Sequence, residues 1–458
     1  MFRKKVKHIH FVGIGGIGMS GIAEVLITLG YDISGSDLKP SPITKRLQDL
    51  GATIFYNHKA KNIGDSQVVV FSSAVSQDNP EILEAKRKKI PVIRRAEMLA
   101  ELMRMKYGIA VAGTHGKTTT TSMIAHIMAK AEMDPTMIIG GKVNAFGSNA
   151  RLGQGEFLVA EADESDGTFL KLSPIIAVIT NIDADHLDYY KDINDIKESF
   201  YNFADKVPFY GALVLCVDDK NVCSLIPRFK KRVISYGINN NADFMAKDIS
   251  SHQMETGFRL LVYGKDMGRV ELKIPGEHNI YNALASIATS YELDIPIEKI
   301  KEALEDFKGV QRRFQIKATV KDIIFVDDYG HHPAEIMATL KAAKKGWNRR
   351  VVVLFQPHRY TRTKALFNDF LKAFLDADKT IITDIYPASE KPIKGVTGKK
   401  LAESMQSKTK KDVIYLPRDK DMAKNIFPLL RQGDIFITIG AGDIYKVGEE
   451  IIKLLGDK

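Results

Sequence analysis

The chain reads Ile109-Ala-Val-Ala-Gly113-Thr-His-Gly116-Lys117-Thr118 early in its second hundred residues, an apolar run followed by a glycine-rich turn. A helical pattern then continues through Ala131. A strand, a loop of small residues and a helix N-terminus present backbone N–H groups to phosphate, and Lys and Thr add a cation and a metal-binding hydroxyl. The loop is shorter than the general phosphate-binding loop, because Gly113 stands only three residues before Gly116. We predict a nucleotide-binding domain built on a parallel sheet; the alternative is a glycine-rich turn that caps a helix.

Carboxylates follow two further apolar strands of this region. Glu161 comes directly after the run 157–160, and Asn181-Ile-Asp-Ala-Asp-His-Leu-Asp188 follows the run 175–179. Because the carboxyl ends of parallel strands meet at one edge of a sheet, we expect both groups near the phosphate loop. Carboxylates and an imidazole suit a divalent cation that keeps several waters. The alternative is a pair of solvated acidic turns.

The first hundred residues open with a second glycine motif. A β-rich run, 8–12, leads into Gly13-Ile-Gly-Gly-Ile-Gly18 and a helical pattern, and Asp37 follows nineteen residues after Gly18. This arrangement is typical of a Rossmann-like βαβ unit that binds a dinucleotide. The spacing leaves three interpretations open: NAD, a nucleotide sugar, or close packing of strand and helix.

The last third again alternates β-rich runs with helical patterns, from residue 323 to residue 439. Arg312-Arg313 precedes it, Asp327-Asp-Tyr-Gly-His-His-Pro333 trails its first strand, and His358-Arg-Tyr-Thr-Arg362 follows the next one. Guanidinium groups bind carboxylates and phosphates, and a carboxylate with an imidazole can align an amine. Exposed basic surface and a helix cap before Pro333 are the alternatives.

Composition limits the function classes. With 458 residues, 45% of them hydrophobic, the chain is long enough for several cores. The net charge of +10 comes from scattered Lys and Arg, which favours small anionic ligands over nucleic acid. Two cysteines, Cys216 and Cys223, exclude a disulfide framework, and we expect both in the core of a cytoplasmic protein. The apolar stretch 11–30 carries six glycines and Glu24, so we expect no membrane insertion.

We therefore expect an α/β protein of three domains: a Rossmann-like N-terminal domain (1–107), a central P-loop ATPase-type domain with a parallel sheet (108–311) and a C-terminal Rossmann-like domain (312–458). Taken together, the phosphate loop, Glu161-Ala-Asp-Glu-Ser-Asp166, the 183–188 acidic segment, His278-Asn-Ile-Tyr-Asn282 and Arg312-Arg-Phe314 resemble the ATP-dependent Mur ligases of peptidoglycan synthesis. The resemblance runs the length of the chain. Gly13-Ile-Gly-Gly-Ile-Gly-Met-Ser20, Ser72-Ser-Ala-Val75, Asp327–Pro333 and Gln356-Pro-His-Arg-Tyr-Thr-Arg362 resemble the alanine-adding branch of that family.

The resemblance implies a nucleotide-sugar site in the first domain, ATP in the second and the amino acid in the third. Nucleotide-sugar contacts are implied at Gly13, Gly15, Gly16, Gly18, Met19, Ser20, Asp37, Ser72 and Ser73. ATP contacts are implied at Gly113, Thr114, His115, Gly116, Lys117, Thr118, Thr119, His278, Asn279, Asn282 and Arg313. Magnesium is implied at Thr118, Glu161 and His186, and the amino acid at Tyr329, His331, His358, Arg359 and Arg362. Catalytic roles are implied for Lys117, Glu161, His186, Asp328 and His331.

The implied reaction joins L-alanine to the lactyl carboxylate of UDP-N-acetylmuramate with ATP and Mg²⁺, in a monomer or homodimer. An acyl phosphate is expected first, since a carboxylate needs a leaving group before an amine can displace it. A recycling ligase that adds a preformed tripeptide is the nearest alternative. An NAD-dependent oxidoreductase would leave the loop at 113–118 unexplained, and a nucleotide-switched binding protein would need a guanine-reading motif or a basic stripe that the chain does not show.

Overall fold

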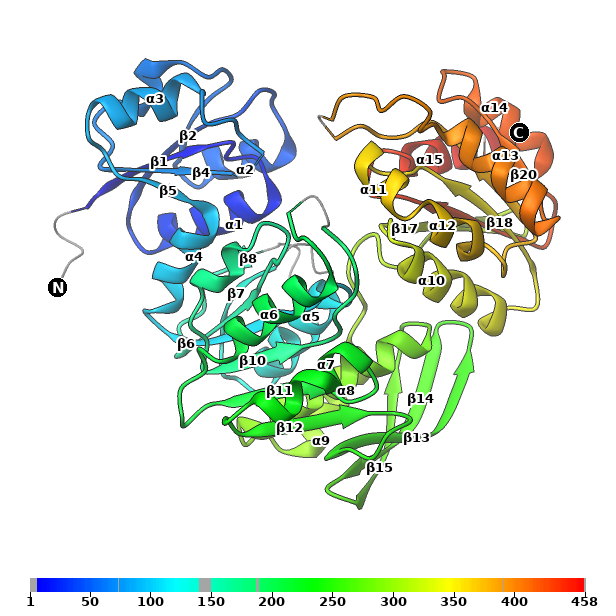
Figure 1. Ribbon diagram of the computed structural model, residues 1–458, viewed down its shortest axis with the longest axis horizontal. Helices are drawn as coiled ribbons and strands as arrows, with labels where there is room; N and C mark the ends of the chain where they lie inside the picture. The colour runs from blue at the N-terminus through cyan, green and yellow to red at the C-terminus, as the bar shows by residue number, and fades with distance from the viewer. Residues whose placement is uncertain (1–5, 73, 140–149, 187–188, 389, 457–458) are drawn as a thin grey trace. The chain divides into compact units, whose positions relative to one another are not determined.

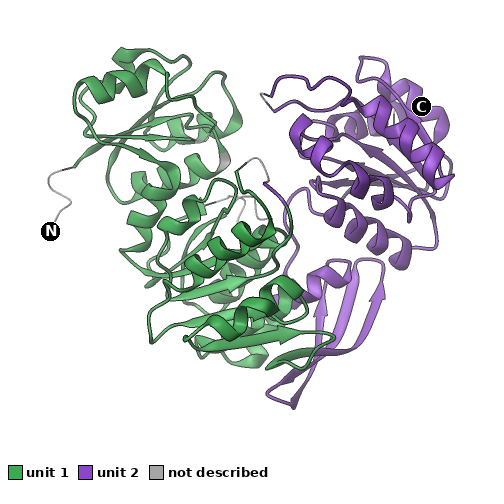
Figure 2. Cartoon of the chain, viewed as in Figure 1, with its two compact units in different colours: residues 1–184, 189–245, 282–303 green, residues 185–188, 246–281, 304–458 purple. Residues whose placement is uncertain are grey.

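The computed structural model describes residues 6–72, 74–139, 150–186, 189–388 and 390–456. The chain divides into two compact units (Figure 2). Unit 1 holds residues 1–184, 189–245 and 282–303, and unit 2 holds residues 185–188, 246–281 and 304–458.

The N-terminal part of unit 1 is a five-stranded sheet with helices around it (Figure 1). Its order is β3-β2-β1-β4-β5, and all neighbours are parallel. The strands are β1 (His8–Val12), β2 (Asp32–Ser36), β3 (Thr53–Phe55), β4 (Val68–Phe71) and β5 (Val92–Arg94). The helices are α1 (Ile17–Thr28), α2 (Pro42–Asp49), α3 (Pro80–Arg87) and α4 (Arg95–Met103), with a short turn η2 (Ala60–Ile63). The predicted Rossmann-like order is confirmed.

The second sheet has the order β15-β14-β13-β12-β11-β10-β6-β9-β7-β8. Its parallel centre is formed by β12 (Val233–Gly237), β11 (Ala212–Cys216), β10 (Ile176–Ile179), β6 (Tyr107–Ala112), β9 (Phe157–Glu161) and β7 (Thr136–Ile138). At one edge β8 (Ala150–Arg151) pairs antiparallel with β7. Every residue of β10 and β11 is buried, as expected for strands covered by helices on both faces. The flanking helices are α5 (Lys117–Lys130), α6 (Ile193–Ala204), α7 (Lys220–Leu225), α8 (Glu277–Glu292) and α9 (Ile297–Asp306).

The same sheet carries an extension that the sequence patterns did not predict. β13 (Phe244–His252) is followed by an antiparallel hairpin of β14 (Glu255–Val262) and β15 (Lys265–Leu272). Polar residues dominate β13 after Ala246, and its last six residues are exposed. A strand with so little apolar alternation is hard to distinguish from a loop by periodicity alone.

Unit 2 contains the third sheet, ordered β16-β17-β21-β18-β19-β20. β16 (Gln315–Val320) pairs antiparallel with β17 (Ile323–Asp328), and the other pairs, among β21 (Asp434–Ile439), β18 (Arg350–Phe355), β19 (Lys379–Ile382) and β20 (Asp412–Tyr415), are parallel. Around it lie α10 (Pro333–Gly346), α11 (Tyr360–Ala365), α12 (Phe367–Ala373), α13 (Gly398–Thr409), α14 (Met422–Ile426) and α15 (Tyr445–Gly456). The α/β class is thus confirmed for all three sheets.

One expectation about the core is wrong. Cys216, at the end of β11, is buried, but Cys223 is exposed. Val222 and Leu225 of α7 turn into the core, so Cys223 falls on the outer face of this short helix.

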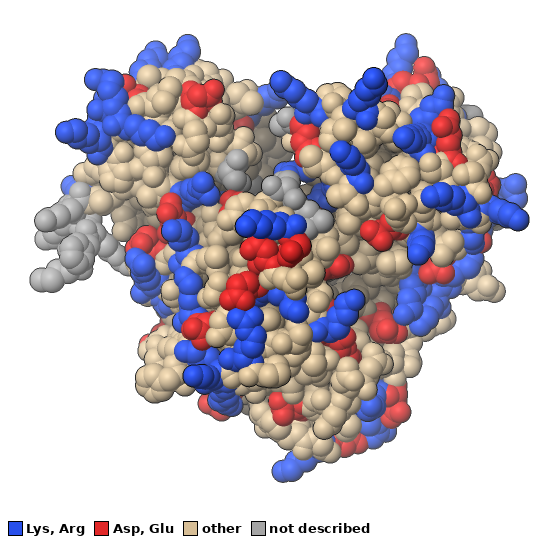
Figure 3. All heavy atoms as spheres, viewed as in Figure 1, with Lys and Arg blue, Asp and Glu red and all other residues tan. Residues whose placement is uncertain are grey.

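Charged side chains of both signs are mixed on the face of the molecule in view. Figure 3 shows Lys and Arg interspersed with Asp and Glu on that face. Of the helices in the described part of the chain, none combines the length and the apolar character needed to cross a membrane.

Candidate active site

The phosphate loop lies between β6 and α5, and its two glycines are required by its surroundings. Gly113 has φ +137° and Gly116 has φ +83°. A Cβ on Gly113 would lie 2.0 Å from Thr180 Oγ1, and a Cβ on Gly116 would lie 2.5 Å from Asn282 Oδ1. Neither position accepts a side chain without movement of the neighbouring strand end or helix.

Asn181 and Thr180 hold the same loop from the neighbouring strand. β10 pairs with β6 so that Ile179 stands opposite Ala112, which brings the residues just after both strands together. Asn181 Oδ1 accepts a bond from the His115 N–H at 2.8 Å, and its Nδ2 donates to the His115 carbonyl at 3.0 Å. Thr180 Oγ1 donates to the same carbonyl at 2.6 Å. No role for these two residues was predicted; their place one step beyond the strand next to β6 is the signal that would have found them.

Lys117 lies over the loop as a phosphate-binding lysine should. Its Nζ donates to the Gly113 carbonyl at 2.5 Å and to Glu164 Oε1 at 2.8 Å. Burial alone would lower the pKa of Lys117, but the negative charges of Glu164 and Asp163 outweigh it and raise the pKa. The ammonium group is therefore charged at neutral pH, and bound phosphates would compete with Glu164 for it.

Glu161 and Thr118 have the donor chemistry that magnesium requires. Glu161 ends β9 opposite Val111 of β6, and its negative charge acts on Lys117. Thr118 is the second residue of α5. A carboxylate and a hydroxyl are hard oxygen ligands, and few of them suffice because Mg²⁺ keeps its waters. His186 belongs to unit 2, where its backbone is left-handed at φ +55° and its N–H donates to Asp185 Oδ1 at 2.8 Å.

The remaining loop residues are tied to the same strand ends. Thr114 Oγ1 accepts the Asp183 N–H at 2.8 Å, and His115 Nε2 lies 3.5 Å from Asp183 Oδ2. Thr119 is buried in the first turn of α5. Asn282 of α8 reaches this loop too, accepting a bond from Thr120 Oγ1 at 3.2 Å. The structure therefore brings Gly113 to Thr119 together with Glu161 and Asn282.

The glycine-rich loop of the first sheet is held by the residues at the end of β2. The Ser36 carbonyl accepts the N–H groups of Gly13 and Ile14 at 2.9 and 3.0 Å. Asp37 Oδ2 accepts the Gly15 N–H at 2.8 Å, and a Cβ on Gly15 would lie 2.7 Å from that oxygen. Asp37 thus shapes the loop in this structure.

The other predicted nucleotide-sugar residues lie around that loop. Gly16 precedes α1 as its N-cap, and Met19 and Ser20 are buried in the first turns of the helix. The Ser72 N–H donates to the Val12 carbonyl at 3.3 Å, which places Ser72 at the end of the neighbouring strand. Ser73 lies outside the described residues.

Arg95 links the start of α1 with Asp163 in the acidic segment after β9, and no role was predicted for it. A Cβ on Gly18 would lie 2.9 Å from its Nη1, so the guanidinium covers the start of α1. Its Nη2 donates to Asp163 Oδ2 at 3.2 Å. Burial would raise the pKa of Asp163, but Arg95 and Lys117 lower it further than burial raises it. Arg95 is the first residue of α4, a helix without any glycine motif, so no local pattern marked it.

In unit 2 the predicted amino-acid residues form one aromatic and basic cluster. The rings of Tyr329 and His331 have centroids 5.6 Å apart, and those of His331 and His358 are 5.8 Å apart. His358 stacks on Tyr386 at 5.6 Å. The backbone N–H of His331 donates to Glu335 Oε2 at 3.0 Å. Burial lowers the pKa of His331 to about 4, so its imidazole is neutral at pH 7 with an unprotonated ring nitrogen, and it is a weak base in this structure.

The two arginines of the cluster differ in their partners. Arg362 is buried against Asp185, with Nη2 and Oδ2 3.3 Å apart. Burial would raise the pKa of Asp185, but the charge of Arg362 together with the neighbouring His186 and His332 outweighs it and holds that pKa far below its usual range. Arg359 has a partly exposed side chain and a left-handed backbone at φ +69°, and its guanidinium makes no ion pair with the residues that the structure describes. Arg359 is the better placed of the two to bind a carboxylate from solution.

Asp328 holds two loops together through its carboxylate oxygens. Its Oδ2 accepts the Phe314 N–H at 2.8 Å and its Oδ1 accepts the Gly330 N–H at 2.7 Å, so it joins two loops. Burial raises its pKa, against the charge of Arg313. Arg313 in turn donates to Glu335 Oε1 at 3.2 Å. Of the two predicted proton acceptors, Asp328 and His331, the geometry favours His331.

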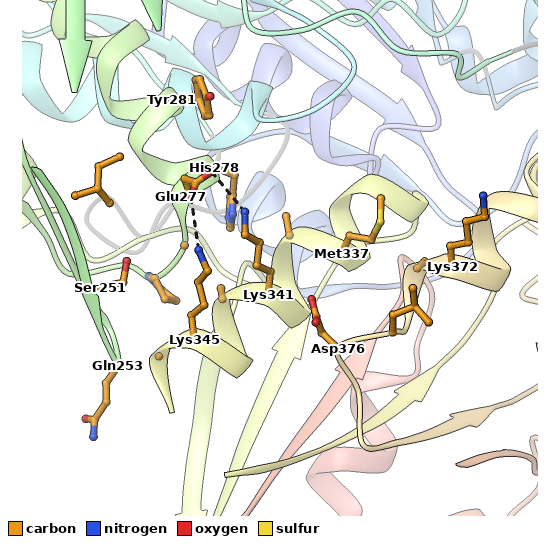
Figure 4. Close-up of a pocket in the computed structure, with 18 residues that line it drawn as sticks. Ser251, Gln253, Glu277, His278, Tyr281, Met337, Lys341, Lys345, Lys372 and Asp376 are labelled. Atoms are coloured by element: carbon orange, nitrogen blue, oxygen red, sulfur yellow. Dashed lines mark ion pairs between the residues drawn. The ribbon is translucent and has the colours of Figure 1, made fainter. Parts of the chain in front are cut away.

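His278 lines a cavity of about 770 Å³ in unit 2 (Figure 4). Figure 4 shows Glu277 paired with Lys341 and Lys345 at its edge, with Nζ to carboxylate distances of 3.5 and 3.8 Å. Burial, and next the charge of Arg313, lower the pKa of His278 to about 4, so this imidazole is also neutral at pH 7. Asn279 Nδ2 donates to the Pro275 carbonyl at 2.7 Å and fastens the start of α8.

Models of known protein families match almost the whole chain. Three family models match in succession: the catalytic domain of the Mur ligase family at residues 8–107, the Mur ligase middle domain at 111–290 and the glutamate ligase domain of Mur ligases at 312–442. The chain belongs to the Mur ligase family. The family resemblance predicted from the motifs is confirmed.

Two curated Mur ligases are similar over nearly their whole length. The UDP-N-acetylmuramate--L-alanine ligase of Geotalea uraniireducens is 59% identical, with 99% of each chain covered. The enzyme of the same name from Syntrophotalea carbinolica is 57% identical, with 98% of each covered.

Solved Mur ligase structures give the same result. The UDP-N-acetylmuramate-alanine ligase of Thermotoga maritima has a TM-score of 0.84 at 32% identity, covering 99% of both chains. The murein peptide ligase of Psychrobacter arcticus has a TM-score of 0.74 over 99% of both chains, but its 24% identity supports only a common fold.

The phosphate loop of this Mur ligase allows a test with a matched control. Gly116→Ala should weaken ATP binding by at least tenfold, because its Cβ would meet Asn282 at 2.5 Å. Gly30 has φ +86° with nothing within 4 Å of its Cβ position. Gly30→Ala should therefore cost only the strain of an alanine in a left-handed backbone conformation, about 1 kcal/mol. Calorimetric titration of ATP into both variants distinguishes the two costs. Equal loss of ATP affinity in both would contradict the contact argument.

The buried histidines of unit 2 predict a loss of stability in mild acid. Burial lowers the pKa of His358 to about 3, with His331 and the nearby arginines adding to the shift, whereas the unfolded chain binds that proton near pH 6.5. The unfolded state therefore binds the proton first as the pH falls. The free energy of unfolding is unaffected above about pH 6.5 and decreases at lower pH, by about 2 kcal/mol per histidine between pH 7 and 5.

His358→Gln should reduce the fall in melting temperature between these two pH values by about 4 °C. The exposed His252→Gln is the control and should behave as wild type; a wild-type pH dependence in His358→Gln would contradict the assignment.

Proposed function

We propose that this Mur ligase joins L-alanine to the lactyl carboxylate of UDP-N-acetylmuramate and that ATP is cleaved to ADP and phosphate in the reaction. The observation that carries the proposal is the phosphate loop after β6: Lys117, which follows this loop at the start of α5, is within reach of the charge of Glu161 at the end of the neighbouring strand β9. The printed names of relatives at 57 and 59% identity support the choice of substrates. Two solved murein peptide ligases, which correspond to the recycling reaction with a preformed tripeptide, are 24 and 30% identical to this chain, well below the 57 and 59% of the alanine ligases.

The proposal assigns one substrate to each part of the chain. Residues 1–107 bind the nucleotide sugar, residues 108–311 bind ATP and residues 312–458 bind the amino acid. His278, Asn279, Asn282 and Arg313 stay assigned to ATP. Because the reaction consumes ATP and makes a nucleotide-linked product, we place it in the cytoplasm.

In the first step the lactyl carboxylate attacks the γ-phosphorus of ATP, and ADP leaves with the electron pair of the broken P–O bond. Lys117 neutralises charge on the β- and γ-phosphate oxygens, and the N–H groups of the loop orient them. Thr118, Glu161 and His186 are the residues that would hold Mg²⁺, which supplies neutralisation of phosphate charge when bound. The product of the step is an acyl phosphate.

In the second step the amine of L-alanine attacks the acyl carbon and phosphate leaves. The amine must first lose a proton, since alanine is an ammonium ion at neutral pH. Neutral His331 accepts it, and Arg359 holds the carboxylate of alanine. Asp328 keeps the loop of His331 in place through its bonds to Phe314 and Gly330.

The experiment is an incubation of the full chain with ATP, Mg²⁺ and UDP-N-acetylmuramate labelled with ¹⁸O in the lactyl carboxylate. L-alanine, glycine, L-serine and the tripeptide are supplied together. Mass spectrometry should find the alanine adduct and one ¹⁸O in each inorganic phosphate released. Tripeptide adduct in place of alanine adduct would favour recycling, and phosphate without ¹⁸O would contradict the acyl phosphate.

A further inference from the structure

A buried carboxylate of unit 1 takes no part in the reaction described above. Glu81 is the second residue of α3, and its side chain is fully buried. Ser36 Oγ donates to Glu81 Oε2 at 2.6 Å, and Asn62 Nδ2 donates to Oε1 at 2.7 Å. His58 Nδ1 lies 3.0 Å from Oε2, and His10 Nε2 lies 3.6 Å from Oε1.

This carboxylate is ionised despite its burial. Burial would raise the pKa of Glu81, but Ser36, His58 and Asn62, which hydrogen-bond to it, and the nearby ring of His10 lower the pKa by more. Glu81 also lies in the first turn of α3, where the positive end of the helix dipole stabilises a negative charge. Removing an ion from water at such a position is costly, whereas burying an apolar side chain there carries no such desolvation penalty. A well-packed apolar residue would serve the core equally well, so the ionic cluster points to a role beyond packing.

The cluster is joined directly to the glycine-rich loop. Ser36 donates its hydroxyl to Glu81, and its carbonyl accepts the N–H groups of Gly13 and Ile14. The next residue, Asp37, accepts the N–H of Gly15. His58 follows β3 at the same carboxyl edge of the sheet, and its side chain is partly exposed there. One buried anion therefore orients a residue under the loop and a residue beside it.

We propose that Glu81 is a positioning residue for the nucleotide sugar, holding Ser36 and His58 so that the loop from Gly13 to Gly18 presents its N–H groups to the diphosphate. The inference rests on the proposed function of this loop. Glu81 itself touches no substrate. Its effect is selective, because the phosphate loop that binds ATP is held by Thr180 and Asn181 and not by this cluster.

The test compares Glu81→Gln with Glu84→Gln. The amide introduced by Glu81→Gln would turn a donor toward either Ser36 or Asn62, both of which donate to Glu81, at almost unchanged volume. Glu84 lies on the same helix and pairs at the surface with Arg87 at 2.7 Å. We expect Glu81→Gln to raise the Kd and KM for UDP-N-acetylmuramate about tenfold, with kcat and the KM values for ATP and L-alanine within twofold of wild type. Glu84→Gln should match wild type throughout.

Ser36→Ala is the second variant, since it removes one link and keeps the buried anion and the backbone bonds. It should raise the same KM about threefold, and it provides the result if Glu81→Gln does not fold. Wild-type KM for the nucleotide sugar in folded Ser36→Ala, or equal rises for all three substrates in Glu81→Gln, would overturn the inference. Failure of the wild-type protein to bind UDP-N-acetylmuramate would refute the proposed function, and this inference with it.

Discussion

Lys117→Ala should lower kcat by about 10³-fold or more while the Kd for UDP-N-acetylmuramate stays within twofold of wild type. Lys117 provides the positive charge at the phosphate loop, and its Nζ donates a hydrogen bond to the Gly113 carbonyl. The Gly13–Gly18 loop is held by a separate set of contacts, with Ser36 and Asp37. Phosphate release measures the first quantity and calorimetry the second.

Lys130→Ala is the matched control, because Lys130 is exposed at the other end of the same helix, α5. Removal of the Lys117 ammonium also leaves the carboxylate of Glu164, which it contacts at 2.8 Å, without this cation. A melting temperature is therefore needed beside the kinetics. Parallel loss of nucleotide-sugar binding in a folded Lys117→Ala protein would contradict the assignment of the two ligands to different loops.

Arg359→Ala should raise the KM for L-alanine about 10²-fold, the effect of losing a charge-assisted, two-pronged bond to a carboxylate. Its KM for ATP should stay near that of wild type. Arg359→Lys keeps the positive charge but loses the planar guanidinium group that can donate two parallel hydrogen bonds, so we expect a KM for L-alanine between those of the wild type and Arg359→Ala. Initial rates at varied alanine concentration measure all three proteins.

Arg349→Ala is the control for loss of a guanidinium elsewhere in unit 2, since Arg349 pairs with Asp322 at 2.7 Å on the surface. Arg362→Ala should behave differently from both, because it leaves Asp185 buried without its cation and should lower the melting temperature. If Arg359→Ala changed only the KM for ATP, the anion held by Arg359 would be a phosphate and not the amino acid.

Local sequence patterns were sufficient for the elements that carry the chemistry. The run 109–118 predicted a strand, a loop and a helix, and β6 and α5 meet at that loop. The runs 157–160 and 175–179 predicted buried strands, which are β9 and β10. The family and its ligase activity were predicted correctly from the resemblance of several motifs to those of Mur ligases, and the comparisons confirm both.

Partners from other parts of the chain were not predictable in the same way. The pair of Arg362 with Asp185 joins residues that are 177 positions apart, and neither has a local pattern that names the other. The same holds for Arg95 over Gly18. The β14–β15 hairpin was missed because β14 is largely buried without strict alternation, and the first half of β15 is polar and not buried.

By itself the sequence determined the α/β class, the glycine positions of both loops and the residue types of the site, because strand periodicity, helix starts and the need for small residues at phosphate are local properties. Only the tertiary structure decided which charges compensate one another. Whether Asp328 holds loops or accepts protons, whether Arg362 or Arg359 is available to a substrate and whether Glu81 lies buried under the first loop depend on strand order and register. Electrostatic energies depend on distance in space and on burial, and neither is encoded in the separation of two residues along the chain.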